Sequence, residues 1–335
     1  MGLIDFRPLV RVTVGGVPLG NLAFSRLRSV RVTDTAGVSS DTCEITFVNT
    51  GALGPATMPT PGAEIEVALG YLGSFKSMGL FIADEIEESS PPRSISITGR
   101  AKAQGETQSG LAPIHQQKTR NWSSDLTLGD IVTTMAGENG LQPGATETAA
   151  AIIAGHIDQI DESDLSVLTR IALAHDLIAK PAGGVLFVGA RAESTSATGN
   201  PLPTVRLREK SVSSWSMRRT FGDMVGTVIA TYRDLEKAED VEVEVGEGEP
   251  VRRLKGRFRS KETATTAAET EARRASRARE SFEATLPGNP NIVADGRIVP
   301  MDFSAAASGE WVITSATHQV GESGYSTAFK SERPE

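Results

Sequence analysis

Apolar and polar residues alternate with a period of two along the first hundred residues of the chain. The apolar positions are Val10, Val12 and Val14, then Val30 and Val32, Cys43, Ile45 and Phe47, Ile65, Val67 and Leu69, Phe81 through Ile86, and Ile95 and Ile97. This spacing is typical of half-buried strands, so about six strands are predicted between residues 9 and 102. Such an array is normally antiparallel and closes into a barrel or sandwich, with no helix longer than a turn.

The pattern changes to a helical period between residues 122 and 190. One apolar stripe has the spacing i, i+3, i+4 and i+7 and consists of Leu128, Ile131, Val132 and Met135. Thr127 followed by Asp130 predicts an N-cap with an acidic partner. A second helix is predicted from Asp161 or Ser163 to His175, and residues 177–188 then favour a short hairpin.

Strand patterns return after a polar, loop-like stretch at residues 193–203. They occupy residues 205–207, 225–232, 251–258, 311–317 and 325–329. One helix interrupts them at residues 261–284, and its predicted inner face is Ala268, Ala272, Ala275 and Phe282. A polar linker is predicted at residues 104–117. We therefore predict an N-terminal β module at 1–105, an α/β middle module at 106–195 and a second β module at 196–335. No clear sequence repeat relates the two β modules.

Composition narrows the class of protein. The chain has 335 residues, which is enough for two or three domains, and its 33 glycines and 5% aromatic content favour short strands joined by turns. A net charge of -8 argues against a general nucleic-acid binder, because neutralising phosphates requires surplus basic residues. The lone Cys43 fits a small core residue made in a reducing cytoplasm. No signal peptide or membrane-spanning run is predicted.

The residues that carry chemistry predict neither a catalytic nor a metal site. The histidines, His115, His156, His175 and His318, lack partners at metal-ligand spacing. Acidic groups at residues 85–88 and 161–164 offer an acid and a base for glycoside hydrolysis, so a peptidoglycan hydrolase is an alternative. Carboxylates at strand ends and helix starts are more often solvated, and no aromatic sugar subsite lies nearby. We expect a non-enzyme without a cofactor.

Two oppositely charged segments adjoin each other in the last third of the chain. Residues 241–249 are acidic, whereas residues 252–259 are basic. A nucleic-acid groove is one interpretation, but a charge-paired hairpin or a contact between subunits fits the acidic neighbour better. We predict that the segments form two arms of a projecting hairpin that contacts a neighbouring chain. The candidate subunit-interface residues are Glu242, Glu244, Arg252, Arg253 and Lys255.

Several stretches resemble the phage late control protein D family, the baseplate hub proteins of contractile tails. In the middle module these are Thr119-Arg120-Asn121-Trp122, Thr127-Leu128-Gly129-Asp130-Ile131-Val132 and residues 158–165, followed by Leu168, Arg170, Ile171 and Ala172. Residues 40–47, Pro61-Gly62, residues 79–84 and the run 300–333 resemble the same family. The resemblance extends over nearly the whole chain.

This resemblance implies two antiparallel β-barrel modules similar to tail-tube subunits, flanking the α/β module. Three chains would form a ring of six barrels and adapt a sixfold tail tube to a threefold central spike. The implied partners are two further copies, the spike, the tail tube protein, baseplate wedge proteins and the tape measure protein. No OB-like module follows the second β module, so we expect the spike to be another protein. The implied location is the virion baseplate, assembled in the host cytoplasm.

Two alternatives remain open at this stage. A distal tail protein of a non-contractile phage belongs to the same structural class. The sequence does not separate a phage from a tailocin or another injection system.

Overall fold

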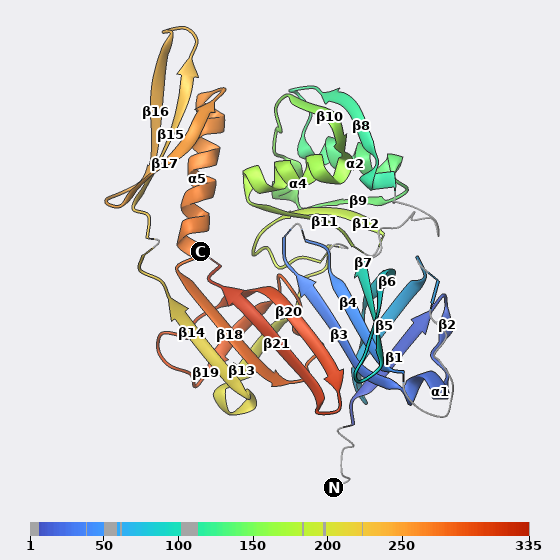
Figure 1. The fold of residues 1–335 in the computed structure, drawn as a ribbon. Coiled ribbons are helices and arrows are strands. Elements are labelled where there is room, and N and C mark those ends of the chain that lie inside the picture. Colours follow the sequence, from blue (N-terminus) through green and yellow to red (C-terminus); the bar gives the residue numbers. More distant parts are fainter. Residues whose placement is uncertain are drawn as a thin grey trace.

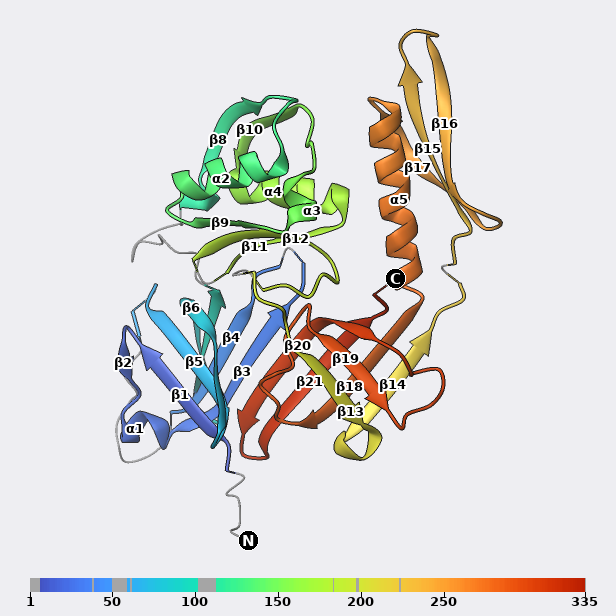
Figure 2. The ribbon, with the colours of Figure 1, turned by 180° about the vertical axis from the view of Figure 1, so that it is seen from behind.

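Two β modules lie side by side, with a small α/β module above them and an arm of sheet and helix beside it (Figure 1). The view from behind gives the same arrangement (Figure 2). This computed structural model describes residues 7–37, 39–49, 59–60, 62–101, 113–182, 184–196, 199–222 and 224–334. Pro61, residues 104–112 of the predicted linker and residues 197–198 of the predicted loop lie outside the described residues.

The N-terminal module contains the strands that the period of two predicts. They are β1 (Leu9–Val14), β2 (Val17–Pro18), β3 (Leu27–Thr35), β4 (Thr42–Val48), β5 (Glu64–Tyr71), β6 (Ser74–Ser89) and β7 (Ser94–Ala101), with the single-turn helix α1 (Asn21–Phe24). The alternating side chains form one buried cluster, in which Cys43 is 1% exposed. Burial raises the pKa of the Cys43 thiol to about 12, so the cysteine is a core residue as predicted.

The middle module places two helices between two small sheets (Figures 1 and 2). Its elements are η1 (Pro113–His115), β8 (Gln117–Trp122), α2 (Leu128–Glu138), β9 (Gln142–Ala145), α3 (Glu147–Ala150), β10 (Ile157–Ser163), α4 (Asp164–His175), β11 (Leu177–Ala182) and β12 (Val185–Ala190). Thr127 and Asp130 form the predicted capping box, and Ser163 caps α4. The whole predicted stripe of α2 is buried, and β11 and β12 form the predicted hairpin.

The C-terminal part contains a β module and the arm. The module strands are β13 (Thr204–Arg208), β14 (Ser214–Arg219), β18 (Glu280–Pro287), β19 (Arg297–Met301), β20 (Trp311–Gly321) and β21 (Gly324–Glu332), with η2 (Glu209–Ser211). The arm consists of β15 (Thr227–Asp234), β16 (Glu239–Gly246), β17 (Val251–Phe258) and α5 (Lys261–Arg277).

The predicted helix at 261–284 is too long, because α5 ends at Arg277. The chain enters β18 at Glu280, where β14 pairs on one side and β21 on the other. Phe282 is fully buried in the core of the β module, not on the helix face. Burial of this aromatic side chain in a paired central strand outweighs the helical pattern that precedes it. Ala268 and Ala275 are buried in the arm as predicted.

The strands of both modules form one sheet, which has 13 strands among the described residues. The modules join where β20 pairs antiparallel with β3, residues 315–321 opposite residues 29–35. The predicted class, mostly β with an α/β insert, is confirmed. The modules are nevertheless not closed barrels as predicted, because β20 occupies the edge of β3 that would close the first one. The predicted boundaries at 105 and 195 stay a proposal.

The middle module is held on the N-terminal module by a half-buried ion-pair cluster. Lys180 Nζ lies 2.9 Å from an Asp41 carboxylate oxygen and 3.4 Å from one of Asp34. Burial raises the pKa of Asp41 to about 6 against the lowering effect of Lys180. Asp34 also accepts a hydrogen bond from the Ala294 backbone, so three segments of the chain meet at this cluster.

Candidate assembly surface

The arm is a three-stranded sheet with α5 packed on one face. β15 lies in the centre, β16 pairs with it antiparallel, and β17 pairs with it parallel. The predicted hairpin is therefore wrong in its pairing, because the acidic and basic strands lie on opposite sides of β15 rather than against each other. Val228 and Ala230 explain this order, since a strand with a fully buried apolar face takes the centre and charged strands take the edges.

Three of the five candidate residues make ion pairs within the chain. Glu242 on β16 and Arg253 on β17 meet across β15 on the face away from α5, 2.5 Å apart. Arg252 points to the opposite face, where its Nη1 lies 2.6 Å from Glu271 of α5. The exposed side chains of Glu244 and Lys255 make no ion pair among the described residues.

The base of the arm is fixed by a cluster that the sequence did not reveal. Asp176 directly follows α4, and its carboxylate lies 2.5 Å from Arg277 and 3.4 Å from Arg191. Arg273 and Arg274 of α5 lie 3.9 and 3.8 Å from the same carboxylate. Four cations from two modules thus converge on one aspartate. Asp176 has a left-handed backbone at the C-cap of α4, and its partners on α5 lie about a hundred residues further along the chain.

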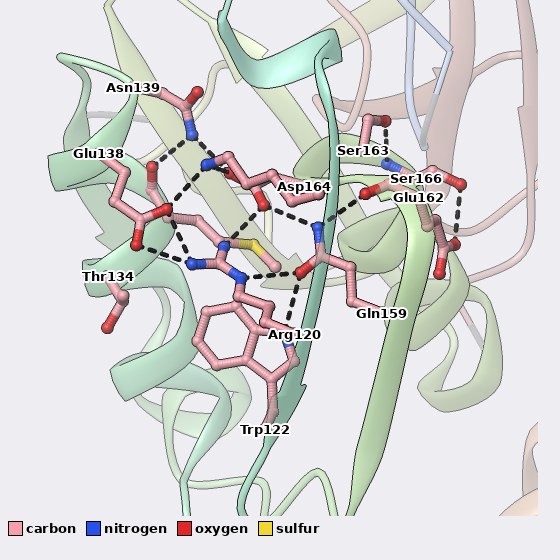
Figure 3. Close-up of polar contacts among 12 residues, drawn as sticks. Arg120, Trp122, Thr134, Glu138, Asn139, Gln159, Glu162, Ser163, Asp164 and Ser166 are labelled. Atoms are coloured by element: carbon pink, nitrogen blue, oxygen red, sulfur yellow. Dashed lines mark hydrogen bonds and ion pairs between the residues drawn. The ribbon is translucent and has the colours of Figure 1, made fainter.

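A second cluster surrounds Asp164 inside the middle module (Figure 3). Its carboxylate is fully buried and accepts hydrogen bonds from Lys118, Arg120, Asn139 and Gln159 at 2.6 to 2.9 Å. Burial raises the pKa of Asp164, but these hydrogen bonds and the Arg120 charge outweigh burial and lower the pKa.

Neighbouring contacts complete the Asp164 cluster. Glu138 binds both Lys118 and Arg120 at 2.7 Å, and the Arg120 guanidinium lies 4.2 Å from the centre of the Trp122 ring. The carboxylate of Asp164 therefore joins β8, β10 and α2 to the start of α4. Asp164 is kept ionised and away from solvent, which is typical of a carboxylate in a structural ion pair.

The remaining candidate chemistry is dispersed. His318 is buried between Tyr325, Thr327 and the backbone carbonyl of Ile292, and burial lowers its pKa. Glu85 and Glu87 lie exposed on β6. Among the described residues no group of three His, Cys, Asp or Glu side chains is arranged to hold a metal ion. The helices in the described part of the chain also include none that is long and apolar enough to span a membrane.

Strand edges, a charged arm and internal ion pairs are the features of an assembly component, a protein whose surfaces carry its function. The chain belongs to the phage tail baseplate hub (GPD) family, whose model matches residues 104–324. The resemblance to this family that was seen in the sequence is thereby confirmed.

Individual relatives agree with this family. The chain is 30% identical over 202 residues to a probable baseplate hub protein of Escherichia phage 186, covering 60% of this chain and 49% of the relative. The probable baseplate hub protein of Escherichia phage P2 is 30% identical over 190 residues, covering 56% of this chain and 46% of the relative. The chain thus spans about half the length of the curated relatives it matches.

A solved structure shares the fold over almost the entire chain. The 43 kDa tail protein of prophage MuSo2 from Shewanella oneidensis superposes with a TM-score of 0.71 and 15% sequence identity, covering 98% of both chains. At this identity the likeness concerns the fold alone.

Proposed function

We propose that the protein is the structural hub of a contractile phage tail or tail-like injection system. In this role it adapts a sixfold tail tube to a threefold central spike. The observation that carries the proposal is the single sheet in which two β modules of one chain stand side by side through β3 and β20. A chain with two such modules supplies six from three copies, and a closed ring of three matches a threefold partner.

The proposed partners follow from this geometry. The spike protein would bind one end of the trimer and the tube protein the other, with baseplate wedge proteins outside and the tape measure protein in contact during assembly. The proposed location is the virion baseplate, after assembly in the host cytoplasm. We propose that the chain acts without catalysis. In support, Asp164, one of the candidate acids, is enclosed by cations and amides.

The copy number tests this proposal directly. We expect a reconstruction of the baseplate to contain three copies of the chain around the axis, with six β modules facing the tube. Isolated protein is expected to remain monomeric if the spike nucleates the ring. Six copies, or one, would reject the trimeric hub.

We also propose that the arm contacts a neighbouring chain through its charged strands. Replacing Arg252, Arg253 and Lys255 together by glutamate is expected to impair assembly. Lys255→Glu is the sharper change, because Arg252 and Arg253 already form ion pairs within the arm. Opposite charge steers such a contact more than it strengthens it, so the defect should be largest at low salt.

The measurement is the yield of assembled baseplates at low and high salt, with the melting temperature of the isolated chain recorded alongside. Lys76→Glu, at an exposed position in the first half of β6 outside the arm, is the matched control and should assemble normally. Normal assembly of both Lys255→Glu and the triple variant at low salt contradicts the arm interface.

A further inference from the structure

The two β modules repeat one strand order, although no sequence repeat relates them. The N-terminal order is β3-β4-β7-β6-β5-β1, and the C-terminal order is β14-β18-β21-β20-β19-β13. Position by position, β14 therefore corresponds to β3, and β20 corresponds to β6. The two outer strands differ in direction, since β13 is parallel to β19 whereas β1 is antiparallel to β5.

The correspondence extends to individual residues of the long strands. The pairing of β6 with β7 shifts register between Ala83 and Glu85, and the pairing of β20 with β21 shifts between Ile313 and Ser315. The preceding segments bind these residues in the same way. Ala83 accepts from the amide of Gly62 at 3.0 Å and donates to Ala63 at 2.9 Å, whereas Ile313 accepts from Asp295 at 2.8 Å and donates to Gly296 at 2.9 Å. Ala83 is thus equivalent to Ile313.

The long strands β20 and β6 are equivalent, but among the described residues only the second half of β20 has a partner strand on both sides. The second half of β20, residues 315–321, pairs with β21 on one side and with β3 on the other. The equivalent half of β6, residues 85–89, pairs with β7 alone among the described residues. The strand equivalent to β3 is β14, which pairs with β18 alone in the same part of the chain. Within the part of the chain that the structure describes, each copy therefore presents one unpaired strand edge of each kind.

We propose that β14 of one copy pairs with the second half of β6 of the next copy and so repeats the β20–β3 junction between chains. The inference rests on the proposed trimeric hub and names its contact. In the N-terminal module the strand pairings lead from Ala83 across β7 and β4 to Val32. In the C-terminal module they lead from Ile313 across β21 and β18 to Met217. Val32 therefore corresponds to Met217, and Ser315, which follows the register shift, corresponds to Glu85. By the same count, Thr317 corresponds to Glu87 and Thr33 corresponds to Arg218. Because Thr317 lies opposite Thr33 where β20 pairs with β3, Glu87 lies opposite Arg218 in the proposed contact between chains.

The faces and charges of the two edges match this register. Ile86 and Met217 pack against the inner clusters of their modules, so the alternating neighbours Glu87 and Arg218 both point to the outer face. Both are exposed, and neither has an ion pair among the described residues. Opposite charges directly across an antiparallel pair are favourable, and an exposed strand edge is normally covered in an assembly. The two edges are different, so the contact is head-to-tail, and three such contacts complete the ring of the proposed trimeric hub.

Oxidative cross-linking in assembled particles tests the register. Directly opposite side chains have Cβ atoms about 4.5–5.5 Å apart, close to the distance that a disulfide needs. Particles carrying Glu87→Cys and Arg218→Cys in the same chain are expected to yield covalent dimers and trimers in denaturing gels. Each single variant, and the pair Lys76→Cys with Arg218→Cys, should remain monomeric. Native Cys43 is buried and stays unreacted.

A charge exchange provides the second measurement. Glu87→Arg and Arg218→Glu alone are each expected to weaken association about fivefold per interface, and the double variant should recover the loss. Melting of the isolated variants excludes a folding defect. Threefold hubs in which the cysteine pair cross-links no more than the controls would overturn the edge pairing but leave the hub role intact. A baseplate without three copies would overturn both.

Discussion

Replacing Asp164 with alanine is expected to lower the free energy of unfolding by about 3 kcal/mol, because four hydrogen-bond donors around this buried site lose a charged acceptor, although Glu138 still pairs with Lys118 and Arg120. Asp164 is 0% exposed, and its two oxygens lie 2.6 Å from Lys118 and 2.7 Å from Arg120. Asn139 and Gln159 lose an acceptor in the same change. Denaturant unfolding monitored by tryptophan fluorescence measures the loss, and Trp122, which lies against Arg120 in the same cluster, contributes to the signal.

The pH dependence of the free energy of unfolding separates the contribution of the Asp164 charge from that of side-chain packing. The folded pKa of Asp164 is lowered, so its contribution is fully present above the unfolded pKa of about 3.9 and is lost as pH falls through the folded value. The stability difference between wild type and Asp164→Ala should therefore narrow in acid below about pH 4. Asp158→Ala, at an exposed carboxylate on β10, is the control and should change stability by no more than about 0.5 kcal/mol. Equal effects of the two substitutions would show that the buried cluster is not stabilising.

Local patterns predicted most of the secondary structure because their causes are local. The alternation in β4 and the capping box at Thr127 each depend on a few adjacent residues, and both are present as expected. The end of α5 was misplaced because the helical pattern runs on to residue 284, whereas Phe282 is drawn into a distant aromatic cluster with Trp215 and Trp311.

Contacts between distant segments were beyond the sequence. The β20–β3 junction joins residues nearly three hundred positions apart, and nothing in either strand specifies its partner. The charged segments of the arm were recognised, but the insertion of β15 between them was not, because adjacent strands in sequence more often pair with each other.

The Asp164 cluster was missed for a related reason. An aspartate at a helix start is typically solvated, whereas the Asp164 carboxylate is enclosed partly by the side chains of Lys118 and Arg120 from β8. Lys118, Arg120 and Trp122 occupy alternate positions of β8, which place two cations and an aromatic side chain on one face. That alternation was the available signal for a buried acidic partner.

Truncating Ile131 to alanine is expected to cost about 2–5 kcal/mol of unfolding free energy, because the side chain is fully buried and its removal leaves a cavity. Ile131 belongs to the predicted stripe of α2 and lies in the core of the middle module with Leu128, Met135 and Leu168. The substitution leaves helix propensity no worse, since alanine is the best helix former, so the loss reports packing alone. The denaturant midpoint of the middle module is the quantity to measure.

Thr133 on the solvent side of the same helix supplies the matched control. It is exposed and its hydroxyl donates only to the Gly129 carbonyl one turn earlier, so Thr133→Ala should shift stability by no more than about 0.5 kcal/mol. Ile131→Val removes a single methylene from the same site and should cost about 0.5–1.5 kcal/mol. If one face of α2 is buried in the core, the loss of unfolding free energy should be larger for Ile131→Ala than for Ile131→Val, and Thr133→Ala should remain near wild type. An unchanged midpoint for Ile131→Ala contradicts that assignment.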